Sequence, residues 1–293
     1  MSIKSVLVPL TGSDKPCDTN SLTSALNIAK HLNCNVDVLH VKRDPKSAAA
    51  FVGEGMTTAM IESVIEMAEK DIDQRCETAR NLFNTMCADR GIDVEAPGET
   101  TPHAAPSARF VEKTGNQEDF LPAYGRMFDL IVVCKKSTVD NSENDLVINA
   151  AILETGRPVL VIDEPIPEEF GKKIAVIWNG SVESSLAITQ SLSLLQAAEK
   201  VSLITAIDDL SEDIKPDEAM RYLKLHGVNA ESCAIRGTTG KSTAEALMDA
   251  AGKFGADFVV MGAYTKSRLR RLFFGAVTGE MLENCKLPIL LVH

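Results

Sequence analysis

Short apolar runs alternate along this chain with longer segments in which apolar residues recur every three or four positions. Val6–Leu10, Val36–Val41 and Leu130–Cys134 have the length and composition of strands that are buried on both faces of a sheet. Ser21–Leu32, between the first two runs, has helical spacing instead. Strands that alternate with helices predict a parallel sheet with helices on both faces.

An unusually long helical pattern extends from Thr58 to Arg90. Its apolar positions keep the helical period at Ile61, Val64, Ile65, Ala68, Ile72, Cys76, Ala79, Leu82, Phe83 and Met86. We expect one long helix, or two in series, that ends at Gly91. Because this stripe exceeds what one sheet face of a small domain needs, we predict that part of it covers the other half of the chain or a second chain.

The remaining elements of the first half follow from the same two patterns. Ser107–Val111 and Pro158–Ile162 are expected strands, and Gln117–Arg126 and Asn144–Thr155 are expected helices. Asp163–Gly171, with two prolines and four acids, has the composition of a linker.

The order of elements then repeats. The matched segments are Lys173–Trp178 with Ser5–Leu10, Asn179–Ser181 with Thr11–Ser13, Asp257–Val260 with Asp129–Val132, and Leu287–Leu290 with Arg157–Leu160. This duplication predicts two domains, residues 1–163 and 171–293, each a doubly wound sheet of five parallel strands. Their closing strands, Pro158–Ile162 and Pro288–Val292, would lie at sheet edges, so we expect them to meet inside one chain as an intramolecular pseudo-dimer. A homodimer through another surface is a second assembly that we consider.

Composition narrows the classes of function. A formal net charge of −11 disfavours nucleic acid as a partner, because binding a phosphate backbone needs a basic face. No apolar run reaches membrane-spanning length, and the N-terminus lacks the apolar core of a signal peptide, so we predict neither a membrane anchor nor secretion.

The cysteines are assigned to a reduced, cytoplasmic protein. All 7 lie outside Cys-x-x-Cys pairs and most lie in apolar runs, so buried thiols are favoured over disulfides or metal ligands. Cys17 is placed in a polar loop after the first strand, where an incidental cysteine is favoured over a reactive thiol.

A loop near the C-terminus carries the main candidate chemistry. The apolar run Phe258–Met261 ends at Gly262, and Gly275 opens a helix-like stretch. In a parallel sheet, strand C-termini and helix N-termini converge at one edge, where the free N–H groups of a helix start can bind phosphate.

This stretch resembles the C-terminal signature of the universal stress protein family. Nucleotide-binding members carry glycine, two residues, glycine, nine residues, glycine, and then serine or threonine. Here the spacing from Gly262 to Gly275 is intact, but Thr265 replaces the middle glycine and Ala276 the hydroxyl residue. The resemblance covers nearly all of both halves except the long helix and the linker. It implies two adenine nucleotide alpha hydrolase-like domains in tandem and a non-catalytic, cytoplasmic stress-response role.

The resemblance also implies which residues would bind an adenine nucleotide, ATP or AMP. The base would lie between Asn179, which stands where the family has an aspartate, and Ala206, with the phosphates over Gly262–Thr265 and the start of the next helix. The whole candidate set is Trp178, Asn179, Gly180, Ser181, Ala206, Gly262, Thr265, Gly275, Ala276, Val277 and Thr278, with Arg268 or Arg271 adding charge.

An alternative stays open for this loop. Gly262 and Gly275 are also typical turn residues, and the chain would then be a nucleotide-free protein-interaction module of the same fold. In the first half, Thr11 stands at the aspartate position and no glycine follows Cys134 before Gly156, so we expect a structural partner domain there.

Other candidate chemistry is weak. Gly237–Ser242 resembles a phosphate-binding loop, but the spacing of its glycines is wrong, and we expect a turn capped by Thr239 or Gly240. The sequence shows no nucleophile and base pair, no carboxylate dyad and no metal-ligand cluster, so neither an enzymatic activity nor a metal is predicted.

Overall fold

The structure is a computed structural model. It describes residues 3–12, 16–45, 57–95, 106–135, 141–207, 215–236, 240–263 and 276–293. The helices are α1 (Pro16–Leu32), α3 (Thr58–Arg90), α4 (Gln117–Gly125), α5 (Asn141–Glu154), α6 (Val182–Gln190), α7 (Leu192–Ala197), α8 (Pro216–Leu225), α9 (Thr243–Phe254) and α10 (Ala276–Asn284). The strands are β1 (Ser5–Leu10), β2 (Asn35–Lys42), β3 (Asp93–Val94), β4 (Ser107–Thr114), β5 (Leu130–Cys134), β6 (Val159–Ile162), β7 (Lys173–Trp178), β8 (Lys200–Ala206), β9 (Ala230–Ile235), β10 (Phe258–Gly262) and β11 (Ile289–Val292).

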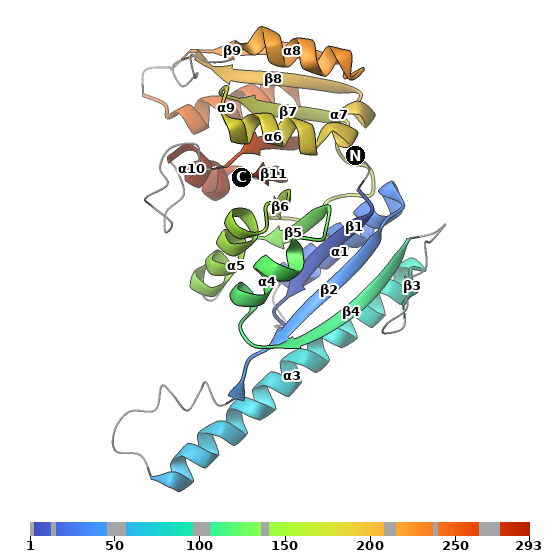
Figure 1. The fold of residues 1–293 in the computed structure, drawn as a ribbon, viewed down its shortest axis with the longest axis vertical. Coiled ribbons are helices and arrows are strands. Elements are labelled where there is room, and N and C mark those ends of the chain that lie inside the picture. Colours follow the sequence, from blue (N-terminus) through green and yellow to red (C-terminus); the bar gives the residue numbers. More distant parts are fainter. Residues whose placement is uncertain are drawn as a thin grey trace.

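The described strands form one 11-stranded sheet in the order β3-β4-β2-β1-β5-β6-β11-β10-β7-β8-β9 (Figure 1). Within each half the pairings are parallel. The order β4-β2-β1-β5-β6 of the first half recurs as β9-β8-β7-β10-β11 in the second, so both halves are wound in the same way. The predicted α/β class with doubly wound parallel strands is therefore confirmed.

The two halves join through their closing strands. β6 and β11 pair antiparallel, with Leu160 opposite Leu290 at the centre of the register. The closing strands therefore meet inside the chain, as their position at sheet edges predicts. This pairing satisfies the edge N–H and C=O groups of both strands and joins the two sets of parallel strands into one continuous sheet. The first half also gains the two-residue strand β3 beside β4.

Side chains alternate between two buried layers because successive strand residues point to opposite faces. Val6 and Val8 of β1 belong to one layer, which also contains apolar side chains of α1, α3, α6, α7 and α8. Leu7 belongs to the other layer, with side chains of α4, α5, α9 and α10. Helices thus cover both faces of the sheet along its length (Figure 1).

The segment between the halves is anchored to α1. The side chain of Asn27 donates to the carbonyl oxygen of Ile166 at 2.8 Å, and the backbone N–H of Ile166 donates to Ser24 Oγ at 3.0 Å. The Ile166 side chain is 1% exposed. The predicted linker, residues 163–171, is therefore packed against α1 at Ile166.

The long helical pattern forms the single helix α3. Gly91 ends it in a left-handed conformation, with φ of 60°, as predicted. Only its C-terminal half has buried residues, from Cys76 to Cys87, and these pack with the first half of the chain. Figure 1 shows α3 at the far end of the molecule from the second half. The expectation that α3 covers the other half is therefore wrong, and cover by a second chain stays a prediction.

Candidate functional site

The turn after β7 lies at the carboxyl end of a central strand of the second half. Gly180 has a φ of 80°, a conformation that favours glycine. Asn179 Oδ1 accepts a hydrogen bond from the backbone N–H of Ser181 at 3.2 Å, and Ser181 Oγ accepts one from the N–H of Ser184 at 3.1 Å. The turn residues therefore cap α6, which gives Asn179 and Ser181 a structural role in the absence of any ligand.

Two buried polar side chains lie directly beside this turn. Among the described residues, the indole Nε1 of Trp178 and the hydroxyl of Thr205 have no hydrogen-bond partner. The two residues are opposite each other across β7 and β8, and they are 4% and 1% exposed. Buried polar atoms are nearly always bonded to protein, water or ligand, so this pair is an exception among the buried groups of the second half.

The sequence interpretation included Trp178 but missed Thr205. Ala206, which was predicted, follows Thr205 and is half-buried at the end of β8. The available signal was a hydroxyl residue near the end of an apolar strand, because Thr205 directly follows Leu203 and Ile204.

Gly262 ends β10 and lies against the start of α6. A Cβ atom added there would lie 2.5 Å from the backbone nitrogen of Ser184 and 2.6 Å from the carbonyl carbon of Glu183. Any side chain would therefore collide with helix backbone. The glycine is required for the packing of α6 on β10, whether or not a ligand binds nearby.

The start of α10 supplies the remaining described part of the predicted site. Ala276 is exposed, Val277 is half-buried and Thr278 is buried. Ser242 Oγ at the N-terminus of α9 donates to Glu280 of α10, which holds the two helices together at this edge. The other predicted positions, Thr265, Gly275, Arg268 and Arg271, lie outside the described residues.

The corresponding turn of the first half is occupied by a side chain of the same chain. Asp18 accepts hydrogen bonds from the backbone N–H groups of Thr11 and Gly12 at 3.0 and 2.9 Å, and from the Thr11 hydroxyl at 3.0 Å. A Cβ atom on Gly12 would lie 2.2 Å from the carbonyl oxygen of Arg75, so α3 passes directly over the turn. A carboxylate and a helix therefore lie at the place where a ligand of the first half would bind.

A disulfide lies beside the same turn, so the expectation of reduced thiols is wrong for Cys17 and Cys134, whereas the other five cysteines are free. Cys17 is bonded to Cys134, with their Cα atoms 5.4 Å apart and a sequence separation of 117. The loop expected at Cys17 is also wrong, because α1 begins at Pro16, a residue that favours the first turn of a helix. The first turn of α1 and the end of β5 meet at one edge of the sheet, and this proximity is invisible in the local sequence.

Residues 240–242, the described end of the glycine-rich segment, lead into the cap of α9, and Thr239 lies outside the described residues. Ser242, rather than Thr239 or Gly240, is the N-cap, and Glu245 completes a capping box with it. Lys241 is paired with Asp249 of the same helix. Both side chains that a phosphate-binding loop would use are therefore engaged by α9 itself.

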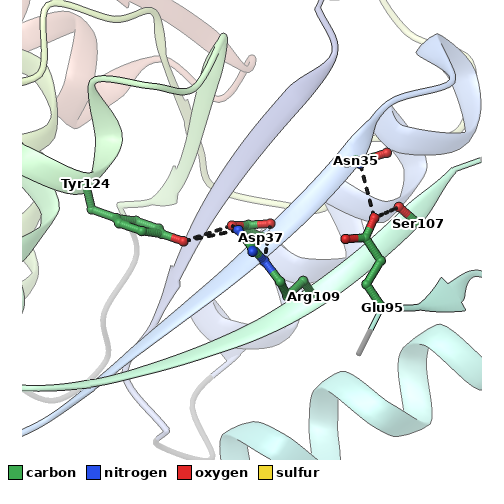
Figure 2. Close-up of polar contacts among 6 residues, drawn as sticks. All are labelled: Asn35, Asp37, Glu95, Ser107, Arg109 and Tyr124. Atoms are coloured by element: carbon green, nitrogen blue, oxygen red, sulfur yellow. Dashed lines mark hydrogen bonds and ion pairs between the residues drawn. The ribbon is translucent and has the colours of Figure 1, made fainter. Parts of the chain in front are cut away.

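Polar clusters on the first half stabilise the sheet edge (Figure 2). Asp37 of β2 is paired with Arg109 of β4 and accepts a hydrogen bond from the Tyr124 hydroxyl at 2.9 Å. Burial and the neighbouring Asp37 carboxylate raise the pKa of Tyr124 to about 12. Glu95 accepts hydrogen bonds from Ser107 and Asn35 at 2.6 and 3.2 Å. These contacts hold β2, β3 and β4 in register.

Two cavities lie away from the predicted residues. One, of about 110 Å³, is at the carboxyl ends of β1 and β2 and is lined by Thr11, His40 and Arg75 among others. The other, of about 540 Å³, lies beside β9 and α9 and is lined by Cys233, Ile235 and Lys253 among others. Neither includes a residue of the candidate set. Within the described ranges, no three histidine, cysteine or acidic side chains are grouped to hold a metal, and no helix has the length and apolarity to cross a membrane.

Residues 171–293 match the family described as the Universal stress protein family. No curated protein matches the chain.

Solved structures extend the similarity of fold to the whole chain. A universal stress protein from Archaeoglobus fulgidus DSM 4304 is 12% identical, covers 98% of this chain and 95% of its own, and has a TM-score of 0.62. A functionally unknown protein from Pseudomonas aeruginosa PAO1 is 14% identical, with coverage of 99% and 92% and a TM-score of 0.53. At these identities the likeness shows the fold alone.

Proposed function

We propose that the second half of the chain, which matches the universal stress protein family over residues 171–293, binds an adenine nucleotide, ATP or AMP. In this proposal the protein is not an enzyme, and nucleotide occupancy sets its state in a stress response. Residues 1–163 and 171–293 are its two domains, and they form the intramolecular pseudo-dimer that β6 and β11 join.

The observation that carries the proposal is the pair of unpartnered polar atoms on Trp178 and Thr205. They lie at the carboxyl ends of two neighbouring strands, next to Asn179 and Ala206. An adenine edge or a ribose offers both donors and acceptors, so it could satisfy an indole N–H and a hydroxyl together. Trp178 packs in the layer of α6 and α10 lies in the opposite layer, so the nucleotide would cross the carboxyl ends of the strands to place its phosphates at the N-terminus of α10.

We propose one nucleotide per chain. In the first half the turn N–H groups of Thr11 and Gly12 are bonded to Asp18, and an incoming anion would have to displace that carboxylate. The disulfide between Cys17 and Cys134 holds the first turn of α1 in place beside it. The first half therefore supports the second as a structural partner.

The test is isothermal titration calorimetry of the full chain with ATP and with AMP. Thr205→Val and Trp178→Phe each remove one donor while keeping an apolar body, so each should weaken binding by roughly two- to tenfold. Thr189→Val is the matched control, because that hydroxyl bonds within α6 to the Leu186 carbonyl and faces solvent. Absence of heat with the native protein at millimolar nucleotide, and no nucleotide in mass spectra of the denatured preparation, would reject the proposal.

A nucleotide-free interaction module is the second candidate, and the surroundings of Gly262 favour it. That glycine is required by the close approach of α6, and the Asn179 side chain caps the turn before the same helix. Both residues would be kept in the sequence without any ligand. Calorimetry separates the two candidates, since only the first predicts saturable binding that depends on Thr205.

A further inference from the structure

Helix α3 extends beyond the body of the first half (Figure 1). It has 33 residues, or about 50 Å at 1.5 Å per residue. No residue from Thr57 to Arg75 is buried, whereas its C-terminal half contributes Phe83 and Met86 to the core. We call residues 58–73 the projecting segment.

The projecting segment carries an apolar stripe that continues the buried one. Ile61, Ile65, Ala68 and Ile72 follow one another at spacings of four, three and four residues and are half-buried. This spacing places them on one face of the helix. The same face continues into Ala79 and Phe83, which are 1% exposed against the sheet. The apolar stripe therefore extends from the core along the projecting segment.

A row of acids runs beside this stripe. Glu62, Glu66, Glu69 and Asp73 have the same spacings, each one residue after an apolar position. Asp73 is 3.5 Å from Lys42, but the three exposed glutamates have no ion-pair partner among the described residues. Like charges three or four residues apart destabilise a helix, so this row has an energetic cost in the isolated protein.

We propose that the projecting segment docks an amphipathic helix of another protein, one whose apolar stripe is flanked by lysine or arginine. The partner's apolar residues would cover Ile61, Ile65 and Ile72, and its cations would neutralise the glutamate row. Charge complementarity thus specifies the partner, since the apolar stripe alone would accept any apolar helix.

A second copy of this chain fits the segment poorly. In an antiparallel pair the two glutamate rows would adjoin, and like charges would repel. In a parallel pair each row would face the opposite flank, which carries Val64, Met67 and Asp71 and offers it no cation. Arg75, which continues the line of the stripe, is already paired with Asp71 at 2.8 Å. The one lysine of the projecting segment, Lys70, lies on the far side of the helix from the stripe, five residues after Ile65.

The experiment uses the full chain and a synthetic helical peptide with leucines at the a and d heptad positions and lysines on both flanks. Fluorescence anisotropy should show saturable binding that weakens at high salt. The variant Glu62→Gln, Glu66→Gln, Glu69→Gln should lose about tenfold in affinity, since three exposed ion pairs are removed. Ile61→Ser with Ile65→Ser should abolish binding, and because both positions lie outside the core, circular dichroism should show an unchanged fold.

The matched control separates the docking site from the overall negative charge. Glu154→Gln, Glu199→Gln, Glu283→Gln removes three exposed acids from other elements and should leave the affinity within about twofold. Equal binding by the two triple variants would overturn the proposal, as would equal binding of a peptide with glutamates in place of the lysines. A native dimer in sedimentation that Ile65→Ser dissociates would also overturn it, because the stripe would then belong to a second copy.

Discussion

Single residues at one register position distinguish the two halves of the sheet. Asp37 lies opposite Arg109 in the first half, and Ser202 lies opposite Glu231 at the matching position of the second. The Asp37 side chain is 10% exposed, because Tyr124 of α4 covers the pair, whereas Glu231 is exposed and pairs with Lys200 at 2.6 Å. The first-half pair is therefore expected to matter more for stability.

The Tyr124 hydroxyl provides a test of that expectation. Tyr124→Phe removes its hydrogen bond to Asp37 and should lower the free energy of unfolding by about 1 kcal/mol, measured in urea. Arg109→Met should cost more, because it leaves the Asp37 carboxylate without its cation. Tyr222→Phe is the control and should change stability by less than about 0.5 kcal/mol. An unchanged free energy of unfolding for Tyr124→Phe would show that water replaces the hydroxyl.

At the scale of elements, one carboxylate anchors α3 to the sheet. Glu112 of β4 is 2.9 Å from Lys42 and 2.7 Å from Arg80, and it accepts a hydrogen bond from Cys76 Sγ. The hydrogen bond from Lys42 is the largest cause that lowers the pKa of Glu112 from 4.5 to about 2. The C-terminal half of α3 is thus fixed by charge as well as by its apolar face.

The lowered pKa sets the direction of a pH dependence. A carboxylate with a lower pKa when folded contributes stability that is present above pH 4.5 and lost as the pH falls towards 2. The native chain should therefore lose more stability over this interval than Glu112→Gln does, in urea unfolding at low salt. Glu77→Gln, at an exposed position of α3, should follow the pH profile of the native chain. Parallel profiles for the native chain and Glu112→Gln would contradict the role of this carboxylate.

The elements themselves could be predicted where periodicity decides them. Buried parallel strands such as β1 and β5, and the long stripe of α3, are visible because burial dictates residue type at every position. The start of α1 was missed because its first turn is polar, and the disulfide was missed because folding alone brings Cys17 to Cys134.

The candidate site was predictable only in part, because part of it depends on contacts that only folding creates. A strand end followed by a turn identifies Trp178 and Asn179 from sequence. The pairing of Trp178 with Thr205 depends on the register between β7 and β8, and the need for glycine at 262 depends on how closely α6 approaches β10. Both are tertiary facts that no local pattern encodes.

At the scale of the whole molecule, a side chain reinforces the junction of the two halves. Lys135 follows β5 of the first half, and its ammonium donates to the carbonyl oxygens of Leu282, at 2.7 Å, and Cys285 at the end of α10. The same ammonium lies 3.8 Å from the carboxylate of Asp163, at the start of the segment between the halves. A cation at a helix C-terminus interacts favourably with the helix dipole, and this side chain is only 13% exposed.

Lys135→Met should therefore weaken the union of the halves more than the fold of either one. The substitution keeps an apolar stem of similar length but leaves carbonyl groups of α10 without their donor, at a cost of roughly 1–3 kcal/mol. Hydrogen exchange should become faster in the last turn of α10 and in β11, while β1 and β8, near the middle of each half, keep their protection. Lys286→Met, one residue beyond Cys285 and exposed, is the control and should leave exchange unchanged. If exchange rises equally in all strands of Lys135→Met, the lysine contributes to global stability and the junction is not a separate cooperative contact.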